Sequence, residues 1–202
     1  MISISNSKVI LRDFIESDIE KRISWETKHT EWKLWDAPWE FDNITQEQKQ
    51  KKLDKYIEKM YALVEKYKIM SDTKKRLSFQ ICNKNNKYIG WCNSYRIDNE
   101  FLYSSEGTKC AIGIDIPDIS YRGKGYAFHS LCLFIDYLME HGESEIYTQT
   151  WSGNIRMINL AKKLGFEECS RKENSRNVRG KKYDGLTFLL NKVLYKKSKQ
   201  EL

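Results

Sequence analysis

The amino-acid sequence predicts an α+β fold, a sandwich of helices around one mixed β-sheet. Hydrophobic periodicity gives the order strand, two helices, three strands, helix, strand, helix and two strands, which is typical of this class. The 202 residues include two prolines, no internal repeat and no linker rich in Pro or Ser. We therefore expect one domain spanning residues 1–202.

The predicted helices have recognisable ends. Ser17 and Asp18 are suitable N-caps for a first helix, and Thr45 with Gln48 resembles a capping box. Gly142 suits the C-terminal cap of the helix that follows the glycine-rich segment. The helices are expected at 17–25, 45–70, 126–141 and 154–164, the last stopped by Gly165.

The predicted strands are short runs of apolar or alternating residues bounded by turn signals. They cover 8–12, 77–83, 88–97, 109–116, 145–151, 166–175 and 183–191. A basic loop, RNVRGKK, is expected to separate the last two.

Composition limits the classes of protein that need to be considered. The formal net charge of +7 favours an anionic partner, which leaves nucleic acid, membrane headgroups or a phosphorylated small molecule. No apolar run approaches the roughly 20 residues of a membrane span, and the N-terminus lacks the apolar core of a signal peptide, so we expect a cytoplasmic protein without membrane contact. The five cysteines are scattered without a C-x-x-C, which argues against disulfides or a zinc site.

The segment SYRGKGYAFHS, residues 120–130, indicates an anion site. It lacks the earlier glycine and the Ser or Thr of a Walker A loop, and Phe128 stands where a dinucleotide fingerprint has its third glycine. Glycines let backbone approach a ligand closely, and the first N–H groups of a helix have no intrahelical acceptors. We expect these amides to bind a diphosphate, with Arg122 and Lys124 adding charge. The alternative is a tight strand-to-helix turn without a ligand.

These residues resemble the GNAT superfamily of N-acetyltransferases. Arg122 to Ala127 match its signature Q/R-x-x-G-x-G/A, and NIRMINLAKKLGFEE at 154–168 is similar to its next characteristic segment. The opening KVILRDFIESDIE and the late GKKYDGLTFLLN resemble the branch that contains ribosomal-protein-alanine N-acetyltransferases.

The resemblance implies a mixed, mostly antiparallel sheet with helices on both faces, and acetyl-coenzyme A between two parallel strands that splay apart. Residues 109–166 would form the coenzyme-binding core, with the helix at 45–70 on the acceptor side. The backbone of the first splayed strand would hold the pantetheine arm, and Asn154 would bond to it. The cofactor-binding residues implied are Ile114, Asp115, Ile116, Arg122, Gly123, Lys124, Gly125, Tyr126, Ala127 and Asn154. No metal is implied.

Catalysis requires a neutral acceptor amine, and about one alkylamine molecule in a thousand or fewer is neutral at pH 7. We nominate Asp115 as the base that removes the proton, with Tyr147, Ser152 and Glu26 as fallbacks and a water relay as an equal alternative. A backbone N–H near Ile114 is expected to stabilise the oxyanion.

Three positions depart from the pattern of the resembled family. Ala161 stands where many members have the tyrosine that protonates the leaving thiolate, and Met157 where the ribosomal-protein branch often has a serine. Ala111 occupies a position that is often acidic. The general acid therefore cannot be assigned from the resemblance.

The acceptor side is predicted from a stretch rich in tryptophan and acid. Aromatic walls with carboxylates suit a cationic amine. The stretch contains Trp25, Trp32, Trp35 and Trp39 with Glu26, Glu31, Asp36, Glu40 and Asp42. The substrate-binding candidates are Glu26, Trp35 and Trp151. The alternative is that the tryptophans only pack the first helices onto the sheet.

The sequence leaves the acceptor and two rival functions open. A polyamine or an aminoglycoside would suit an acidic pocket, whereas a protein N-terminus, such as that of a ribosomal protein, would need an open groove. A non-catalytic acyl-coenzyme A sensor is one rival. A ribosome- or RNA-binding module is the other, suggested by the lysines of 47–76 and the tail YKKSKQEL, and weakened by intermingled acids. The chain is expected to be a monomer or a homodimer.

Overall fold

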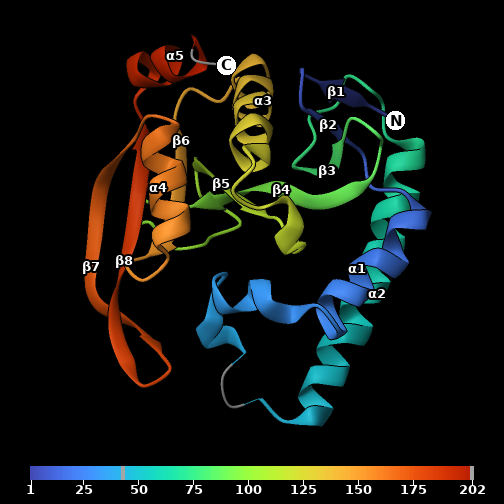
Figure 1. Ribbon diagram of the computed structural model, residues 1–202, viewed down its shortest axis with the longest axis horizontal. Coiled ribbons are helices and arrows are strands. Elements are labelled where there is room, and N and C mark those ends of the chain that lie inside the picture. Colours follow the sequence, from blue (N-terminus) through green and yellow to red (C-terminus); the bar gives the residue numbers. More distant parts are fainter. Residues whose placement is uncertain (42–43, 201–202) are drawn as a thin grey trace.

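The computed structural model describes residues 1–41 and 44–200, and it contains one sheet whose eight strands follow the order β1-β2-β3-β4-β5-β6-β8-β7 (Figure 1). Only β5 and β6 pair in parallel, and the other neighbours are antiparallel. The strands are β1 Ser3–Ser5, β2 Val9–Arg12, β3 Ser78–Asn83, β4 Tyr88–Ile97, β5 Lys109–Asp115, β6 Ile146–Trp151, β7 Phe166–Val178 and β8 Lys181–Leu190. The mixed, mostly antiparallel sheet is confirmed.

Helices cover both faces of this sheet, as predicted (Figure 1). They are α1 Ile19–Thr27, α2 Gln46–Ile69, α3 Tyr126–Glu140, α4 Ile155–Lys163 and α5 Lys192–Gln200. Successive strand residues point to opposite faces. Phe79 therefore meets Phe134 of α3, with ring centroids 5.9 Å apart, whereas Cys82 belongs to a cluster with Trp25 of α1. None of the helices within the described ranges is long and apolar enough to cross a membrane.

The predicted caps of the two longest helical patterns are present. Thr45 accepts a hydrogen bond from the amide of Gln48, and the Gln48 side chain accepts one from the amide of Thr45, which completes the capping box of α2. Gly142 follows α3 with a φ of 90°. On α2 the exposed Lys51 pairs with Glu47, as an ordinary solvated helix face does.

The terminal elements differ from the prediction. β1 and α5 were not expected, because a three-residue strand and a lysine-rich tail carry little periodicity. The expected loop at 176–182 is instead mostly strand: β7 and β8 form a long hairpin that turns at Arg179 and Gly180, both at positive φ. Asp18 does not cap α1 with its side chain, because that carboxylate binds Arg12 at 2.6 Å. Asp42 and the last two residues of the tail lie outside the described residues.

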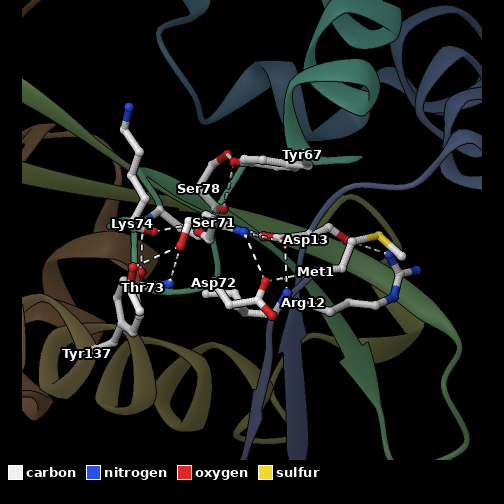
Figure 2. Close-up of polar contacts among 12 residues, drawn as sticks. Met1, Arg12, Asp13, Tyr67, Ser71, Asp72, Thr73, Lys74, Ser78 and Tyr137 are labelled. Carbon is white, nitrogen blue, oxygen red and sulfur yellow. Dashed lines mark hydrogen bonds and ion pairs between the residues drawn. The ribbon is translucent and has the colours of Figure 1, made fainter. Parts of the chain in front are cut away.

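A buried ion pair ties the first strands to the segment after α2. The Arg76 guanidinium donates to Asp13 at 2.9 and 3.1 Å, and both side chains are at most 1% exposed. Arg76 also donates to the carbonyl oxygens of Ser71 and Lys74, each at 2.8 Å. Figure 2 shows Asp13, Ser71 and Lys74 among the polar contacts of this region. A buried charge is stable only when it is paired and hydrogen-bonded, and this cluster meets both conditions.

The parallel pair separates toward the ends of its strands. Pairing of β5 with β6 stops at Ile112 and Thr148, while β5 continues beside β4 as far as Asp115 and β6 continues beside β8 as far as Trp151. Each strand therefore leaves one backbone edge without a strand partner. This divergence, which the resemblance implied, positions the site.

Candidate functional site

A cavity of about 1090 Å³ lies at the divergence of β5 and β6. Gly113 to Ile116 and Gln149 to Trp151 line its two strand walls, and residues at the start of α3 and on α4 line its end. The segment of short helices η2 Thr30–Leu34 and η3 Pro38–Glu40 lines the opposite side. Residues far apart in the sequence thus meet around one space.

The glycine loop before α3 leaves several backbone donors free. Gly123 and Gly125 have φ values of 69° and 83°, which L side chains rarely adopt, and a Cβ at Gly123 would meet nothing within 4 Å. Among residues 1–41 and 44–200, no group accepts a hydrogen bond from the amides of residues 123–128. These N–H groups and the helix dipole favour an anion, as the sequence predicted.

The two basic side chains of this loop differ in position. The Arg122 guanidinium donates to the carbonyl oxygen of Ile116 at 2.7 Å, and it pairs with Glu31. Its side chain lines the cavity. Lys124 is exposed and does not line it, because the loop directs this residue away from the cleft.

The free edge of β5 presents backbone groups to the gap between the strands. The Thr148 hydroxyl donates to the carbonyl oxygen of Ile112 at 2.9 Å, so the backbone groups of Ile112 face β6. Backbone groups alternate between the two edges of a strand. The N–H and C=O of Ile114 therefore face the gap as well, beyond the last paired residue.

Asn154 connects α4 to the acceptor side. Its side-chain oxygen accepts a hydrogen bond from the amide of Met157, which caps the helix, and its Nδ2 donates to the carbonyl oxygen of Trp35 at 3.1 Å. The Trp151 indole donates to the same oxygen at 2.9 Å. The polar side chain that was expected to bond a pantetheine arm thus lines the cavity but already has two protein partners.

Asp115 lines the cavity at the end of β5. Burial among protein atoms raises the pKa of this carboxyl well above its ordinary value, and the charge of Asp36 raises it further. The nearby Arg22 acts in the opposite direction. A carboxyl with these neighbours loses its proton at a higher pH than a solvated one does.

A second acidic group lines the same cavity, and its charge acts on Asp115. Asp36 and Glu40 both line it. Burial raises the pKa of Asp36 to about 6, with further contributions from the charges of Glu40 and Glu26. Glu26 pairs with Lys33 at 2.7 Å and does not line the cavity, so it acts on the site through its charge.

Two of the catalytic candidates do not reach the cavity, and these predictions are corrected. Tyr147 is buried at the paired end of β6, where its hydroxyl donates to Glu145 at 2.9 Å. Ser152 accepts a hydrogen bond from the amide of Asp184, which ties the end of β6 to β8. Among the described residues that line the cavity neither is present: Tyr147 lies on the same face of β6 as Gln149 but at the end paired with β5, and Ser152 follows the last residue of the strand.

The tryptophans divide between packing and the cavity. Trp25 is buried beside Trp91, 5.9 Å between ring centroids, and serves the core. Trp32 packs edge-on against Trp91 and also lines the cavity. Trp35, Trp39 and Trp151 line it too. Some tryptophans of this segment thus pack the core, and others form part of the cavity wall.

Sequence reasoning missed Arg22 and Arg156. The Arg22 guanidinium stacks on the Trp91 ring, 3.1 Å from its centroid, and Arg156 lies 4.1 Å over the ring of Trp35. Arg22 is three residues from both Ile19 and Trp25, so it lies on the apolar face of the predicted helix. A basic residue on that face was the sequence signal that could have identified it.

The split parallel pair, the glycine loop with free amides and the cleft between them define an acetyl-coenzyme A-dependent acyltransferase. The chain belongs to the GNAT acetyltransferase family, because the model "Acetyltransferase (GNAT) domain" matches residues 8–167. It is an enzyme that uses acetyl-coenzyme A as acetyl donor.

Solved structures with the same fold include acetyltransferases that are named for different acceptors. The ribosomal-protein-S5-alanine acetyltransferase from Vibrio fischeri is 16% identical, covers 94% of this chain and 96% of its own, and has a TM-score of 0.67. A spermidine N-acetyltransferase chimera from Vibrio cholerae and hSSAT is 17% identical, with coverages of 94% and 98% and a TM-score of 0.62. The microcin C7 self-immunity acetyltransferase, solved with acetyl-CoA and AMP, is 14% identical, with coverages of 91% and 92% and a TM-score of 0.64. A sequence search of curated proteins finds no match.

Proposed function

We propose that this enzyme acetylates a primary amine on a small molecule that carries further positive charge, such as a polyamine or an aminoglycoside. The observation that carries the proposal is the pair of carboxyl groups, Asp36 and Asp115, which line one cavity and lie close enough for the charge of Asp36 to act on Asp115, with Glu40 near the first. Their mutual repulsion is relieved when a cation lies between them.

Aromatic side chains add to this preference. Trp35, Trp39 and Tyr95 line the same cavity. Aromatic faces attract ammonium groups, most strongly where water is excluded. A neutral or anionic acceptor would leave both the carboxylates and the rings without a partner.

The coenzyme fits the opposite end of the cleft. The unpaired amides of residues 123–128 would hold its diphosphate, and the free edge of Ile114 would hold the pantetheine arm. Bound there, the coenzyme supplies an activated acetyl thioester. The charge surplus of +7 then attracts one anionic cosubstrate, while the acceptor end remains acidic.

Asp115 is the side chain best placed to manage the amine's proton. Its Oδ atoms accept the proton, directly or through water, and the raised pKa brings this carboxyl closer to the operating pH of a general base. The N–H of Ile114, which faces the gap, is the proposed oxyanion donor. Ala161 and Met157 have no acidic hydrogen to donate to the leaving thiolate. A general acid is less critical here, because a thiol has a pKa of about 8.5 and its thiolate is a good leaving group.

A protein N-terminus fits less well, although a neighbour of this fold is a ribosomal-protein acetyltransferase. The carbonyl oxygen of Trp35 is bonded to both Trp151 and Asn154, so the chain crosses the cleft where an extended peptide would lie.

The test is a thiol-release assay with acetyl-coenzyme A and a panel of acceptors. Spermidine, an aminoglycoside, the monoamine butylamine and peptides beginning with Ala or Ser are compared at equal concentration. We expect kcat/KM to rise with the number of positive charges on the small amine. Turnover of the peptides alone, or a preference for butylamine, would reject the proposal.

A further inference from the structure

The segment 30–40, here called the strap, connects the two ends of the cleft. It contains η2, η3 and the residues between them, and its Trp35, Asp36 and Trp39 line the cavity. Residues of β6, of the N-terminal cap of α4 and of β7 contact the strap. The carbonyl oxygen of Trp35 accepts hydrogen bonds from Trp151 and Asn154, and Arg176 of β7 lies 4.6 Å over the Trp39 ring.

One carboxylate, that of Glu31, joins the strap to the arginines of the coenzyme end. One of its oxygens pairs with Arg122, and the other lies 3.5 Å from Arg156. The oxygen that faces Arg156 also accepts a hydrogen bond from the Trp35 indole at 2.9 Å. Glu31 therefore contacts two cations and the strap's central aromatic ring at once.

Both arginines belong to segments that face the expected polyanion. Arg122 opens the glycine loop, Arg156 lies in the first turn of α4, and both line the cavity. A single negative charge between them cancels part of the positive field that an incoming phosphate would meet. Glu31 is 35% exposed in its side chain, so a competing anion can reach the arginines.

The same carboxylate fixes the acceptor end. The Trp35 indole donates its edge N–H to Glu31, and Arg156 stacks on a face of the same ring at 4.1 Å. The two contacts together hold the Trp35 ring in place. Asp36, the next residue, is one of the two carboxyl groups proposed to receive the cationic amine. Loss of the Glu31 charge thus removes the ion pairs with Arg122 and Arg156. It also weakens the hydrogen bond that holds Trp35, the residue before Asp36.

We propose that Glu31 is a positioning residue that couples the two ends of the cleft. Its carboxylate weakens the attraction of Arg122 and Arg156 for the coenzyme's phosphates, and it strengthens amine binding by holding Trp35 and Asp36 in place. The second half rests on the proposed acceptor, whereas the first half requires only the coenzyme. Removal of the charge must therefore change the two affinities in opposite directions.

The test is Glu31→Gln, which keeps the size and shape of the side chain. Calorimetric titration with coenzyme A, in the absence of any amine, should show a Kd lowered by roughly two- to fivefold, as expected for one partly exposed ion pair. The KM for spermidine at saturating acetyl-coenzyme A should rise by a similar factor. A residue that only supports the fold would weaken both.

Glu47→Gln is the matched control, because it removes the same charge from an exposed carboxylate of α2 whose one ion pair within residues 1–41 and 44–200 is with Lys51. It should leave both constants unchanged. Glu31→Asp, which keeps the charge, should return the Kd of coenzyme A toward the wild-type value and guards against a folding defect of the glutamine variant.

An unchanged or raised Kd for coenzyme A in Glu31→Gln would overturn the proposal, and so would an unchanged KM for spermidine or equal effects in Glu47→Gln. If the wild-type enzyme turned over no cationic amine, the proposed function would fail separately, and the calorimetric comparison would still decide whether Glu31 restrains the arginines.

Discussion

Trp91 lies directly opposite Asp115 in the antiparallel ladder of β4 and β5. Directly opposed residues place their side chains on the same face, a few ångströms apart. Arg22 stacks on Trp91 at 3.1 Å from the ring centroid and donates to the Tyr88 hydroxyl at 2.9 Å. A fixed positive charge therefore stands beside a carboxyl whose pKa is raised, first by burial and then by Asp36.

The first prediction concerns Asp115→Asn. If Asp115 is the base, activity rises with pH as this carboxyl loses its proton, and the raised pKa places the acidic limb at a higher pH than for a solvated aspartate. The variant should lose that limb of the kcat/KM profile, and kcat at pH 7 should fall by about 10²- to 10⁴-fold. A pH–rate profile with an unchanged acidic limb would remove Asp115 from this role.

Arg22→Met tests the neighbouring charge. Arg22 lowers the pKa of Asp115, so its removal should raise that pKa further and move the acidic limb to higher pH. Arg22→Lys, which keeps the charge, should move it less. A limb that stays in place in both variants would show that the charge does not act on the titrating group.

Asp36 supplies a second pH-dependent effect. Its pKa is raised to about 6, by burial first and then by the charges of Glu40 and Glu26. Above that pH the carboxylate attracts a cationic amine, and below it the attraction is lost. The KM for spermidine should therefore rise as the pH falls through about 6, and Asp36→Asn should show a raised KM without this dependence. The KM for butylamine should respond less in both cases, and an equal response would contradict the assigned contact.

Gly125→Val tests the glycine loop. Gly125 has a φ of 83°, and a left-handed conformation costs an L residue about 1–2 kcal/mol, with more expected for a β-branched one. The loop should rearrange and its amides should lose their common direction, so the Kd of coenzyme A should rise by at least about tenfold, a change of about 1.4 kcal/mol. Gly142→Val at the other end of α3, with a φ of 90° and nothing within 4 Å of its Cβ, imposes comparable strain without touching the loop. Equal binding in the two variants would contradict this placement of the diphosphate.

Removal of the buried carboxylate of Asp13 should lower the free energy of unfolding more than removal of the exposed carboxylate of Asp72. Asp13→Ala leaves a guanidinium buried without its carboxylate, which destabilises proteins by about 3–5 kcal/mol. Urea denaturation with linear extrapolation measures the free energy of unfolding. Asp72→Ala removes a carboxylate that is 66% exposed and 3.7 Å from the same Arg76, and it should cost about 0–1 kcal/mol. Similar losses in both variants would contradict this ranking.

Local signals predicted the glycine loop and most of the sheet. Left-handed glycines, capping residues and apolar periodicity act over a few neighbouring positions, so they can be recognised without knowledge of the fold. The same signals failed for β1 and α5, which are stabilised mainly by packing and carry weak patterns. They also failed for Tyr147, whose position along β6 depends on where the pairing with β5 stops.

The sequence by itself determined the class of fold, the glycine-rich start of α3 and the acidic, aromatic character of residues 25–41, because each depends on residue types at short spacing. Only the tertiary structure decided that Asp36 and Asp115 line one cavity, that Glu31 reaches Arg122 and Arg156, and that Asn154 bonds to Trp35. These contacts join residues about 80 to 125 positions apart along the chain. Their physical basis is the divergence of two strands, which brings together side chains that no local pattern relates.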